Sequence, residues 1–182
     1  MSLKAIEKIR SKLGAAAVIS DPGPEYGSDK WFARGVPDAV VFPSSTEETA
    51  FVMREAARAG MSVTPRGAGY GYVGGCTPLE GGIVICLDRM NRILEINGRD
   101  FVAVVQPGVI TGRLQEAVRA QNLFYPPDPA SLKDCSIGGN IATNAGGPRC
   151  LKYGVTRHYV LGLKVVLPDG SIVPCGGRTH KN

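Results

Sequence analysis

The sequence predicts an α+β fold that starts with a βαβ unit and continues in a mixed or antiparallel sheet. Two short apolar segments, 39–42 and 61–64, flank a segment of helical periodicity from Thr46 to Ala59. This order is typical of strands joined by a crossover helix. Near the end of the chain, the turn sequence at 168–171 (Pro-Asp-Gly-Ser) separates two further apolar segments, which predicts a hairpin.

An amphipathic helix is expected over residues 2–13, with Gly14 at its end. Its apolar residues recur every three or four positions on one face: Leu3, Ile6, Ile9 and Leu13. Residues 21–29 are rich in proline and glycine and predict an extended connection. We therefore divide the chain into an N-terminal part, 1–37, and a main domain, 38–182.

The crossover helix has clear end signals. Ser45 followed by Glu48 matches a capping box, and Gly60 ends the helix. Further strands are expected at 83–87, 93–96, 101–105, 161–167 and 172–174. A helix is expected over 111–121, with Leu114, Val118 and the stem of Gln121 toward the core.

A glycine-rich loop, residues 65–75 (P-R-G-A-G-Y-G-Y-V-G-G), follows the strand at 61–64 directly. Successive backbone N–H groups in such a turn form a concave anion site, and glycine lets a phosphate approach the backbone closely. The loop does not match the G-x-G-x-x-G dinucleotide fingerprint, because Tyr72 stands at the third glycine's place.

A second glycine-rich stretch runs from Tyr125 to Gly154, with three prolines at its entry and two Gly-Gly pairs. Little of it suits a helix or a strand. Irregular segments longer than about 12–15 residues are uncommon without a binding or catalytic role. We expect the two glycine-rich segments to share one ligand; the alternative is a long surface loop.

Composition excludes several classes of protein. The net charge of +5 is scattered along the chain, so a nucleic-acid surface is not expected. No apolar run is long enough for a transmembrane segment or a signal peptide, which makes the cytoplasm the expected location. Five widely spaced cysteines without a C-x-x-C pair predict reduced thiols and no metal site. His158 and His180 fit no catalytic or metal-binding constellation.

Six motifs in this order carry a family resemblance: P-R-G-A-G-Y-G-Y-V-G-G, V-V-Q-P-G-V, P-P-D-P-A-S, C-S-I-G-G-N, A-T-N-A-G-G and L-K-Y-G. They resemble the two-lobed FAD-binding domain of the vanillyl-alcohol oxidase/p-cresol methylhydroxylase (PCMH) type. Within that family the similarity is greatest to the flavoprotein D subunit of glycolate oxidase and to D-lactate dehydrogenases. The resemblance implies FAD, and a domain incomplete at its C-terminal end, with the substrate domain absent.

The resemblance also implies which residues hold the cofactor. The pyrophosphate would lie on the first loop, at Pro65, Arg66, Gly67, Ala68, Gly69, Tyr70, Gly71, Gly74 and Gly75. The rest of FAD would contact Pro127, Asp128, Pro129, Ser131, Ser136, Ile137, Gly138, Gly139, Asn144, Gly146, Gly147, Tyr153 and Gly154. The family commonly has threonine where this chain has Tyr70. From the residues alone, Arg66 could be a surface ion-pair partner and Asp128 a turn former.

The implied activity is oxidation of a D-2-hydroxy acid, glycolate or D-lactate, to the 2-oxo acid by hydride transfer to FAD. No histidine falls within the matched motifs, so we expect noncovalent FAD. The expected partners are the substrate, bound through the missing domain, and other oxidase subunits or an electron acceptor. Catalytic residues are not assigned. Two alternatives stay open: a non-catalytic flavin-binding remnant or assembly piece, and a binding module for another nucleotide.

Overall fold

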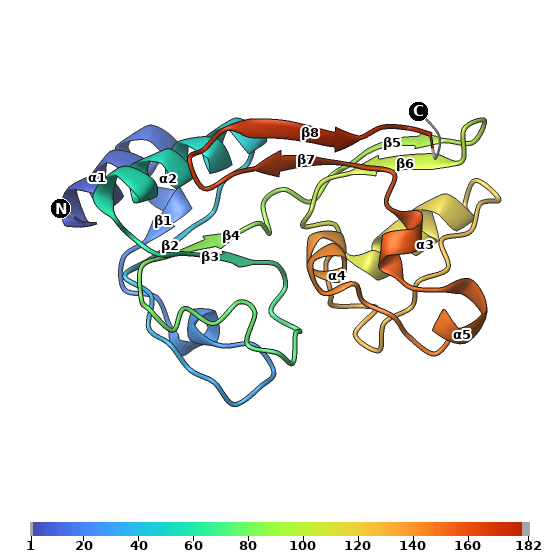
Figure 1. Ribbon diagram of the computed structural model, residues 1–182, viewed down its shortest axis with the longest axis horizontal. Helices are drawn as coiled ribbons and strands as arrows, with labels where there is room; N and C mark the ends of the chain where they lie inside the picture. The colour runs from blue at the N-terminus through green and yellow to red at the C-terminus, as the bar shows by residue number, and fades with distance from the viewer. Residues whose placement is uncertain (1, 180–182) are drawn as a thin grey trace.

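The structure is a computed structural model of the chain, and it describes residues 2–179. Its elements form two lobes that lie side by side (Figure 1). The N-terminal lobe contains α1 (Ser2–Leu13), β1 (Val18–Ile19), β2 (Ala39–Val41), α2 (Thr46–Ala59), β3 (Val63–Arg66), β4 (Ile83–Cys86) and the 3-10 turns Ala15–Ala17 and Pro24–Gly27. The second lobe contains β5 (Ile93–Asn97), β6 (Val102–Val105), α3 (Thr111–Arg119), α4 (Ile137–Thr143), α5 (Cys150–Tyr153) and the 3-10 turn Thr156–Tyr159.

The N-terminal sheet has the strand order β1-β2-β4-β3. β2 and β3 both run parallel to β4, which lies between them, and β1 pairs antiparallel with β2. The predicted crossover from β2 through α2 to β3 is therefore confirmed, but the two strands are not neighbours. The loops that follow β3 and β4 leave the same edge of the sheet.

Both faces of the central strands are buried. On one face, Ile6 and Ile9 of α1 and Val52 of α2 pack against β2 and β4 in a single apolar cluster. On the other, Val40 and Val84 pack against Ile19, Tyr26 and Phe42. Strands buried on both faces read as continuous apolar runs, as these do. The sheet is thus a rigid base for the loop that follows β3.

α2 begins and ends where its capping signals predict. The Ser45 hydroxyl accepts a hydrogen bond from the Glu48 N–H at 3.1 Å. The Glu48 carboxylate accepts from the Ser44 N–H at 2.7 Å rather than from Ser45, so the reciprocal bond of the capping box is shifted by one residue. Gly60 follows the helix in the left-handed conformation, with φ of 64°.

The second lobe has its own small core, formed by Val109, Leu114, Val118 and Ile137. β5 and β6 pair as an antiparallel ribbon beside α3. The expected core position of Gln121 is wrong, because its side chain is exposed and Gln115 is the buried glutamine of α3. Gln115 Nε2 donates to the carbonyls of Tyr125 and Pro127 at 3.1 and 2.8 Å.

The prediction that residues 125–154 contain little regular structure is wrong in part, since α4 and α5 lie within this stretch. Ser136 caps α4, and Asn144 ends it in the left-handed conformation, with φ of 50°. Two glycines lower the intrinsic helix propensity of α4. Tertiary packing overrides that propensity, because Ile137 and Asn140 are buried and Asn140 Nδ2 donates to Thr111 Oγ1 at 2.5 Å.

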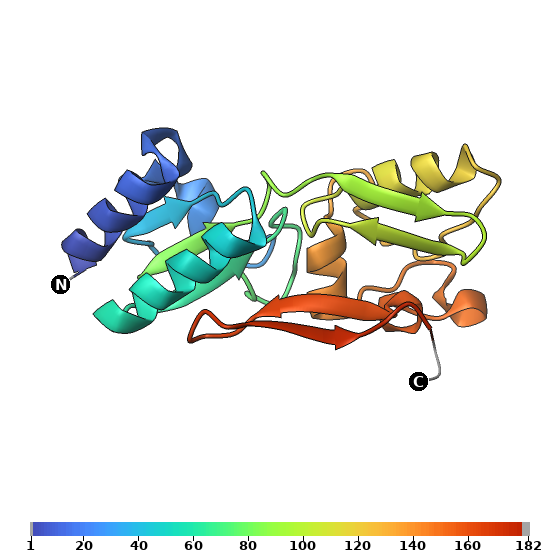
Figure 2. The same ribbon diagram turned by 90° about the horizontal axis from the view of Figure 1, so that it is seen from above.

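The predicted C-terminal hairpin is present as β7 (Gly162–Val166) and β8 (Ile172–Gly176), and it spans both lobes (Figure 2). At its turn, Arg54 Nη1 of α2 donates to the Gly170 carbonyl at 2.9 Å. At its other end, Arg178 forms an ion pair with Glu95 of β5 at 2.6 Å. The hairpin therefore ties the two lobes together. Within residues 2–179, no helix is long and apolar enough to cross a bilayer.

Candidate functional site

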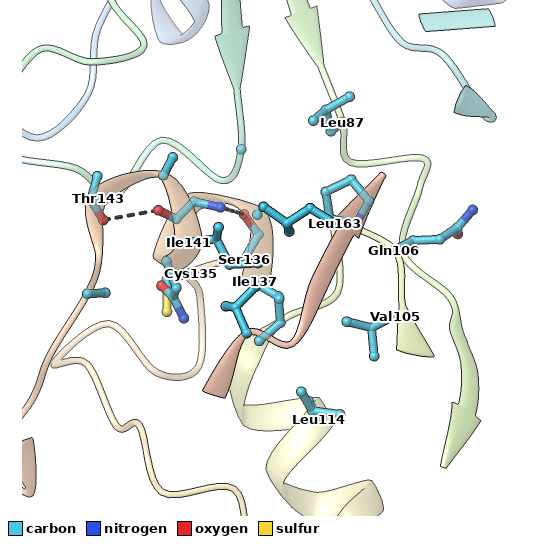
Figure 3. Close-up of a pocket in the computed structure, with 18 of the residues that line it drawn as sticks. Leu87, Val105, Gln106, Leu114, Cys135, Ser136, Ile137, Ile141, Thr143 and Leu163 are labelled. Carbon is cyan, nitrogen blue, oxygen red and sulfur yellow. Dashed lines mark hydrogen bonds between the residues drawn. The ribbon is translucent and has the colours of Figure 1, made fainter. Parts of the chain in front are cut away.

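A cleft of about 1700 Å³ lies between the lobes. The loop after β3 forms one wall, α4 and the segment before it a second, and β6 and β7 a third. In Figure 3, Val105, Ile137 and Leu163, from β6, α4 and β7, are drawn around the same part of the cleft. Cofactor sites are commonly concave and mostly apolar, with a few polar groups that fix orientation. This cleft is large enough for a dinucleotide.

The glycine loop supplies the polar groups at one wall. The backbone N–H groups of residues 67–71 donate to no acceptor anywhere in residues 2–179. Gly69 has φ of 74° and Gly74 has φ of 71°, conformations that favour glycine. Five consecutive unpaired donors beside a cleft can serve a bound anion with several oxygens.

The N-terminus of α4 contributes differently. The N–H groups of Ile137 and Gly138 donate to the carbonyls of Val109 and Pro107, both at 2.8 Å. The Ser136 hydroxyl accepts from Gly139 at 3.4 Å. Because these donors already have partners, the N–H groups of residues 137–139 are not free for a ligand, whereas those of residues 67–71 are. α4 forms the wall that faces them.

The two glycine-rich segments meet at Gly67. A Cβ atom on Gly67 would lie 2.6 Å from Ser136 Oγ, and one on Gly138 would lie 2.7 Å from Cβ of Pro107. A side chain on Gly138 would clash with Pro107, and one on Gly67 would displace the Ser136 hydroxyl that caps α4. Both segments line the same cleft, and their sharing of one ligand stays a prediction.

Arg66 is oriented by protein contacts. Its Nη1 donates to the Ser28 carbonyl at 2.7 Å and lies 3.3 Å from Cys76 Sγ. Its guanidinium also lies beneath Gly69, where a Cβ atom would collide with Nη2. The Arg66 side chain thus supports the glycine loop from within the protein. This role differs from both predictions for Arg66, a surface ion-pair partner and a cofactor contact.

Asp128 lies outside the cleft lining. Its carboxylate forms an ion pair with Arg149 Nε at 3.1 Å and accepts from the Arg149 N–H at 3.2 Å. Its carbonyl packs against Gly147, which leaves no room there for a Cβ atom. These contacts hold the turn after α4 and favour the turn-forming interpretation of Asp128.

The structure brings most of the predicted residues to one surface. Those that line the cleft are Pro65, Arg66, Gly67, Ala68, Gly69, Tyr70, Gly71, Gly75, Pro129, Ser131, Ser136, Ile137, Gly138, Gly139, Gly146 and Gly147. Those that do not are Gly74, Pro127, Asp128, Asn144, Tyr153 and Gly154. Residues of the second set lie in the turns and helix caps next to the cleft-lining residues. Asn144, for example, caps α4, and its side chain accepts from the Arg157 N–H at 3.0 Å.

Sequence reasoning missed the wall built by β6 and β7. Val104, Val105, Leu163 and Val165 line the cleft, as does Tyr125. Burial raises the pKa of Tyr125 to about 12, so its hydroxyl stays protonated at neutral pH. The strands themselves were predicted, but nothing in their alternating pattern says which partner their apolar face meets.

The cysteines are unpaired, and two of them lie close to the glycine loop. Burial raises the pKa of the Cys76 thiol, and it raises that of Cys86 to about 12. Both are therefore thiols rather than thiolates at neutral pH, which makes them poor nucleophiles.

A sequence model of the FAD binding domain family matches residues 37–176. The chain is 45% identical to the glycolate oxidase subunit GlcD of Bacillus subtilis over 172 residues, which cover 94% of this chain and 35% of that protein. It is 43% identical to the D-lactate dehydrogenase of Anaerostipes hadrus over 150 residues, covering 82% and 31% of the two chains. The chain thus spans about a third of the length of these curated relatives.

Solved structures show the same fold. Alkyldihydroxyacetonephosphate synthase superposes with a TM-score of 0.85 at 22% identity, covering 97% of this chain and 38% of that one. A 4-ethylphenol oxidase from Gulosibacter chungangensis superposes with a TM-score of 0.76 at 30% identity, covering 94% and 34%. p-Cresol methylhydroxylase has a TM-score of 0.80 at 24% identity, covering 94% and 35%. The two-lobed arrangement therefore recurs across relatives with diverged sequences.

Proposed function

Because this chain belongs to the FAD binding domain family, we propose that it binds FAD noncovalently in the cleft between its lobes. The observation that carries the proposal is the run of unpaired N–H groups at residues 67–71, at the wall of an apolar cleft. A pyrophosphate is a multiply charged anion, and charge-assisted hydrogen bonds from backbone amides suit it without ordering a long side chain.

The residues present fit this cofactor. Residues 67–71 would hold the pyrophosphate, and the rest of FAD would lie against Pro129, Ser131, 136–139 and 146–147. The remaining predicted positions would support these segments: Gly74, Pro127, Asp128, Asn144, Tyr153 and Gly154. When bound, FAD supplies the capacity to accept a hydride, while the protein positions it and sets its surroundings.

The parent activity we propose is oxidation of a D-2-hydroxy acid, glycolate or D-lactate, to the 2-oxo acid. The names of the relatives support this substrate class: a glycolate oxidase subunit, a D-lactate dehydrogenase and, in Stutzerimonas stutzeri, a D-2-hydroxyglutarate dehydrogenase that is 38% identical over 181 residues. The chain's own role in that reaction is to hold FAD. Turnover by residues 1–182 alone is not expected, because the chain spans about a third of these relatives.

We further propose an electron-acceptor partner or other oxidase subunits, because reduced FAD must be reoxidised before each new turnover. We also propose a cytoplasmic location, with membrane association through partner subunits.

The activity is tested in a fusion protein. It joins this chain to the part of the Bacillus subtilis glycolate oxidase subunit GlcD that follows the aligned region. The FAD-loaded protein is mixed under anaerobic conditions with D-lactate, glycolate or L-lactate, and flavin absorbance is followed. We expect D-lactate or glycolate to bleach the flavin and L-lactate to leave it oxidised. Bleaching by none of them, or by L-lactate alone, would contradict the assignment of the substrate class.

A further inference from the structure

The segment 28–31 lies against the glycine loop, although it precedes the matched residues 37–176 and lies outside the motifs predicted to bind the cofactor. The Lys30 N–H donates to the Gly71 carbonyl at 2.9 Å. The Ser28 carbonyl accepts from Arg66 Nη1 at 2.7 Å. The segment therefore contacts the loop through its backbone on either side of Asp29.

Asp29 makes the central contact of this segment. Its side chain is buried, with 7% of the residue exposed. Oδ2 accepts from the Gly74 N–H at 2.8 Å, and Oδ1 accepts from the Trp31 N–H at 2.8 Å. The first bond joins positions 45 residues apart, whereas the second closes a local turn. One carboxylate thus fixes both its own segment and the far end of the glycine loop.

The chemistry of these contacts requires a carboxylate. Ionised Asp accepts hydrogen bonds on both oxygens, whereas the amide of Asn has one acceptor and one donor group. Asn at position 29 could therefore keep one of the two bonds and would turn an N–H₂ group toward the other donor. Gly71 packs here as well, since a Cβ atom on it would lie 3.2 Å from Oδ2.

The loop needs an external restraint of this kind. Residues 67–75 include five glycines, and glycine loses more conformational freedom on ordering than any other residue. A loop ordered before its ligand arrives spends less of the binding free energy on ordering. Asp29 orders the loop through Gly74 and leaves the N–H groups of 67–71 unpaired.

We propose that Asp29 is a positioning residue for the cofactor: it holds the glycine loop in the conformation that presents the N–H groups of 67–71 to the pyrophosphate. Asp29 acts through the loop and not as a ligand contact, because both of its carboxylate oxygens accept hydrogen bonds from the protein. This inference rests on the proposed function, since FAD is the ligand it concerns.

The test compares Asp29→Ala and Asp29→Asn with the unchanged chain, using FAD and ADP as probes. Asp169→Ala is the matched control, because Asp169 accepts from the N–H of Ser171, two residues on, at 2.8 Å in the β7–β8 turn. We expect Asp29→Ala to raise the Kd of both probes roughly tenfold or more. Asp29→Asn should raise it less, and Asp169→Ala should leave it unchanged.

Stoichiometry separates positioning from folding. A positioning role raises Kd while one FAD still binds per chain; a folding role lowers the number of sites and leaves Kd unchanged. The inference is overturned by an unchanged Kd in Asp29→Ala, or by a loss of sites without a change in Kd.

A ligand-free measurement keeps the test independent of FAD binding. By hydrogen exchange, the Gly74 and Lys30 amides should be protected in the unchanged chain and exposed in Asp29→Ala. Failure of the unchanged chain to bind FAD would count against the proposed function, whereas unprotected Gly74 in that chain would count against the role of Asp29.

Discussion

Gly67 lies where the two glycine-rich segments touch, and the packing there leaves no room for a side chain. A methyl group in Gly67→Ala would approach Ser136 Oγ to 2.6 Å and separate the loop from α4. We expect this variant to weaken FAD binding roughly tenfold or more, measured by fluorescence titration. Gly98→Ala is the control, because a Cβ atom there meets nothing within 4 Å. Equal affinities in the two variants would contradict this account of the junction.

Single residues in this sequence differ in how far along the chain their partners lie. Ser45 and Gly60 act on their own neighbours, and the run of glycines at 67–75 marks a loop by itself, so these roles could be predicted. Asp29 and Arg66 act on partners 45 and 38 positions away. No local pattern encodes such pairing, so the sequence predicted the loop but not the residues that hold it.

At the scale of elements, α3 fixes the entry to α4 through Gln115. Gln115→Leu would leave the carbonyls of Tyr125 and Pro127 without their donor in a buried site. Leaving buried polar groups unpaired costs about 1–3 kcal/mol, so we expect a loss of that size in urea unfolding. Gln121→Leu, on the exposed end of the same segment, should change stability by less than about 0.5 kcal/mol. A neutral Gln115→Leu would contradict the role of this contact.

The contact between α1 and α2 predicts a pH dependence. Glu55 of α2 is 5% exposed and pairs with Lys8 at 2.7 Å and with Arg58 at 2.7 Å. The hydrogen bond from Lys8, with that from Arg58, holds the pKa of the Glu55 carboxyl below its usual value. Its contribution to stability is therefore complete above the unfolded-state pKa of about 4.3 and is lost as pH falls through the lower folded-state pKa.

Glu55→Gln tests this dependence. The variant should be less stable than the unchanged chain in urea at about pH 7, by roughly 1–2 kcal/mol. The difference should shrink as pH falls below the unfolded-state pKa of about 4.3 and through the lower folded-state pKa, because Glu55 then becomes protonated in both states. If the difference in unfolding free energy between the two chains stays constant with pH, the charge of Glu55 does not contribute to stability.

Among the elements, the sequence predicted α2 and the C-terminal hairpin because caps and turn residues mark their ends. It missed α4, whose paired glycines favour a loop and whose stability comes from the burial of Ile137 and from the bond between Asn140 and Thr111. The sequence also did not predict that β6 and β7 line the cleft, because their position there depends on how the two lobes pack together.

At the scale of the whole molecule, the cleft is formed by both lobes and by the hairpin that joins them. A ligand that bridges them should stabilise the folded chain as a unit. With FAD at about 100 times its Kd, the expected gain is about 2.7 kcal/mol. For a domain of this size that corresponds to a rise in Tm of roughly 5–10 °C in a thermal scan. A Tm that does not respond to saturating FAD would contradict binding across the two lobes.

The amides of residues 67–71 are the groups that we propose bind the pyrophosphate. Heteronuclear NMR of the chain during titration with FAD, and separately with ADP, tests this proposal most directly, since each amide reports its own hydrogen bond. We expect saturable shifts, large at residues 67–71 with both ligands and smaller at residues 137–140, whose amides already have partners. Shifts centred on 137–140, or no response at 67–71 from a folded chain, would contradict the proposal.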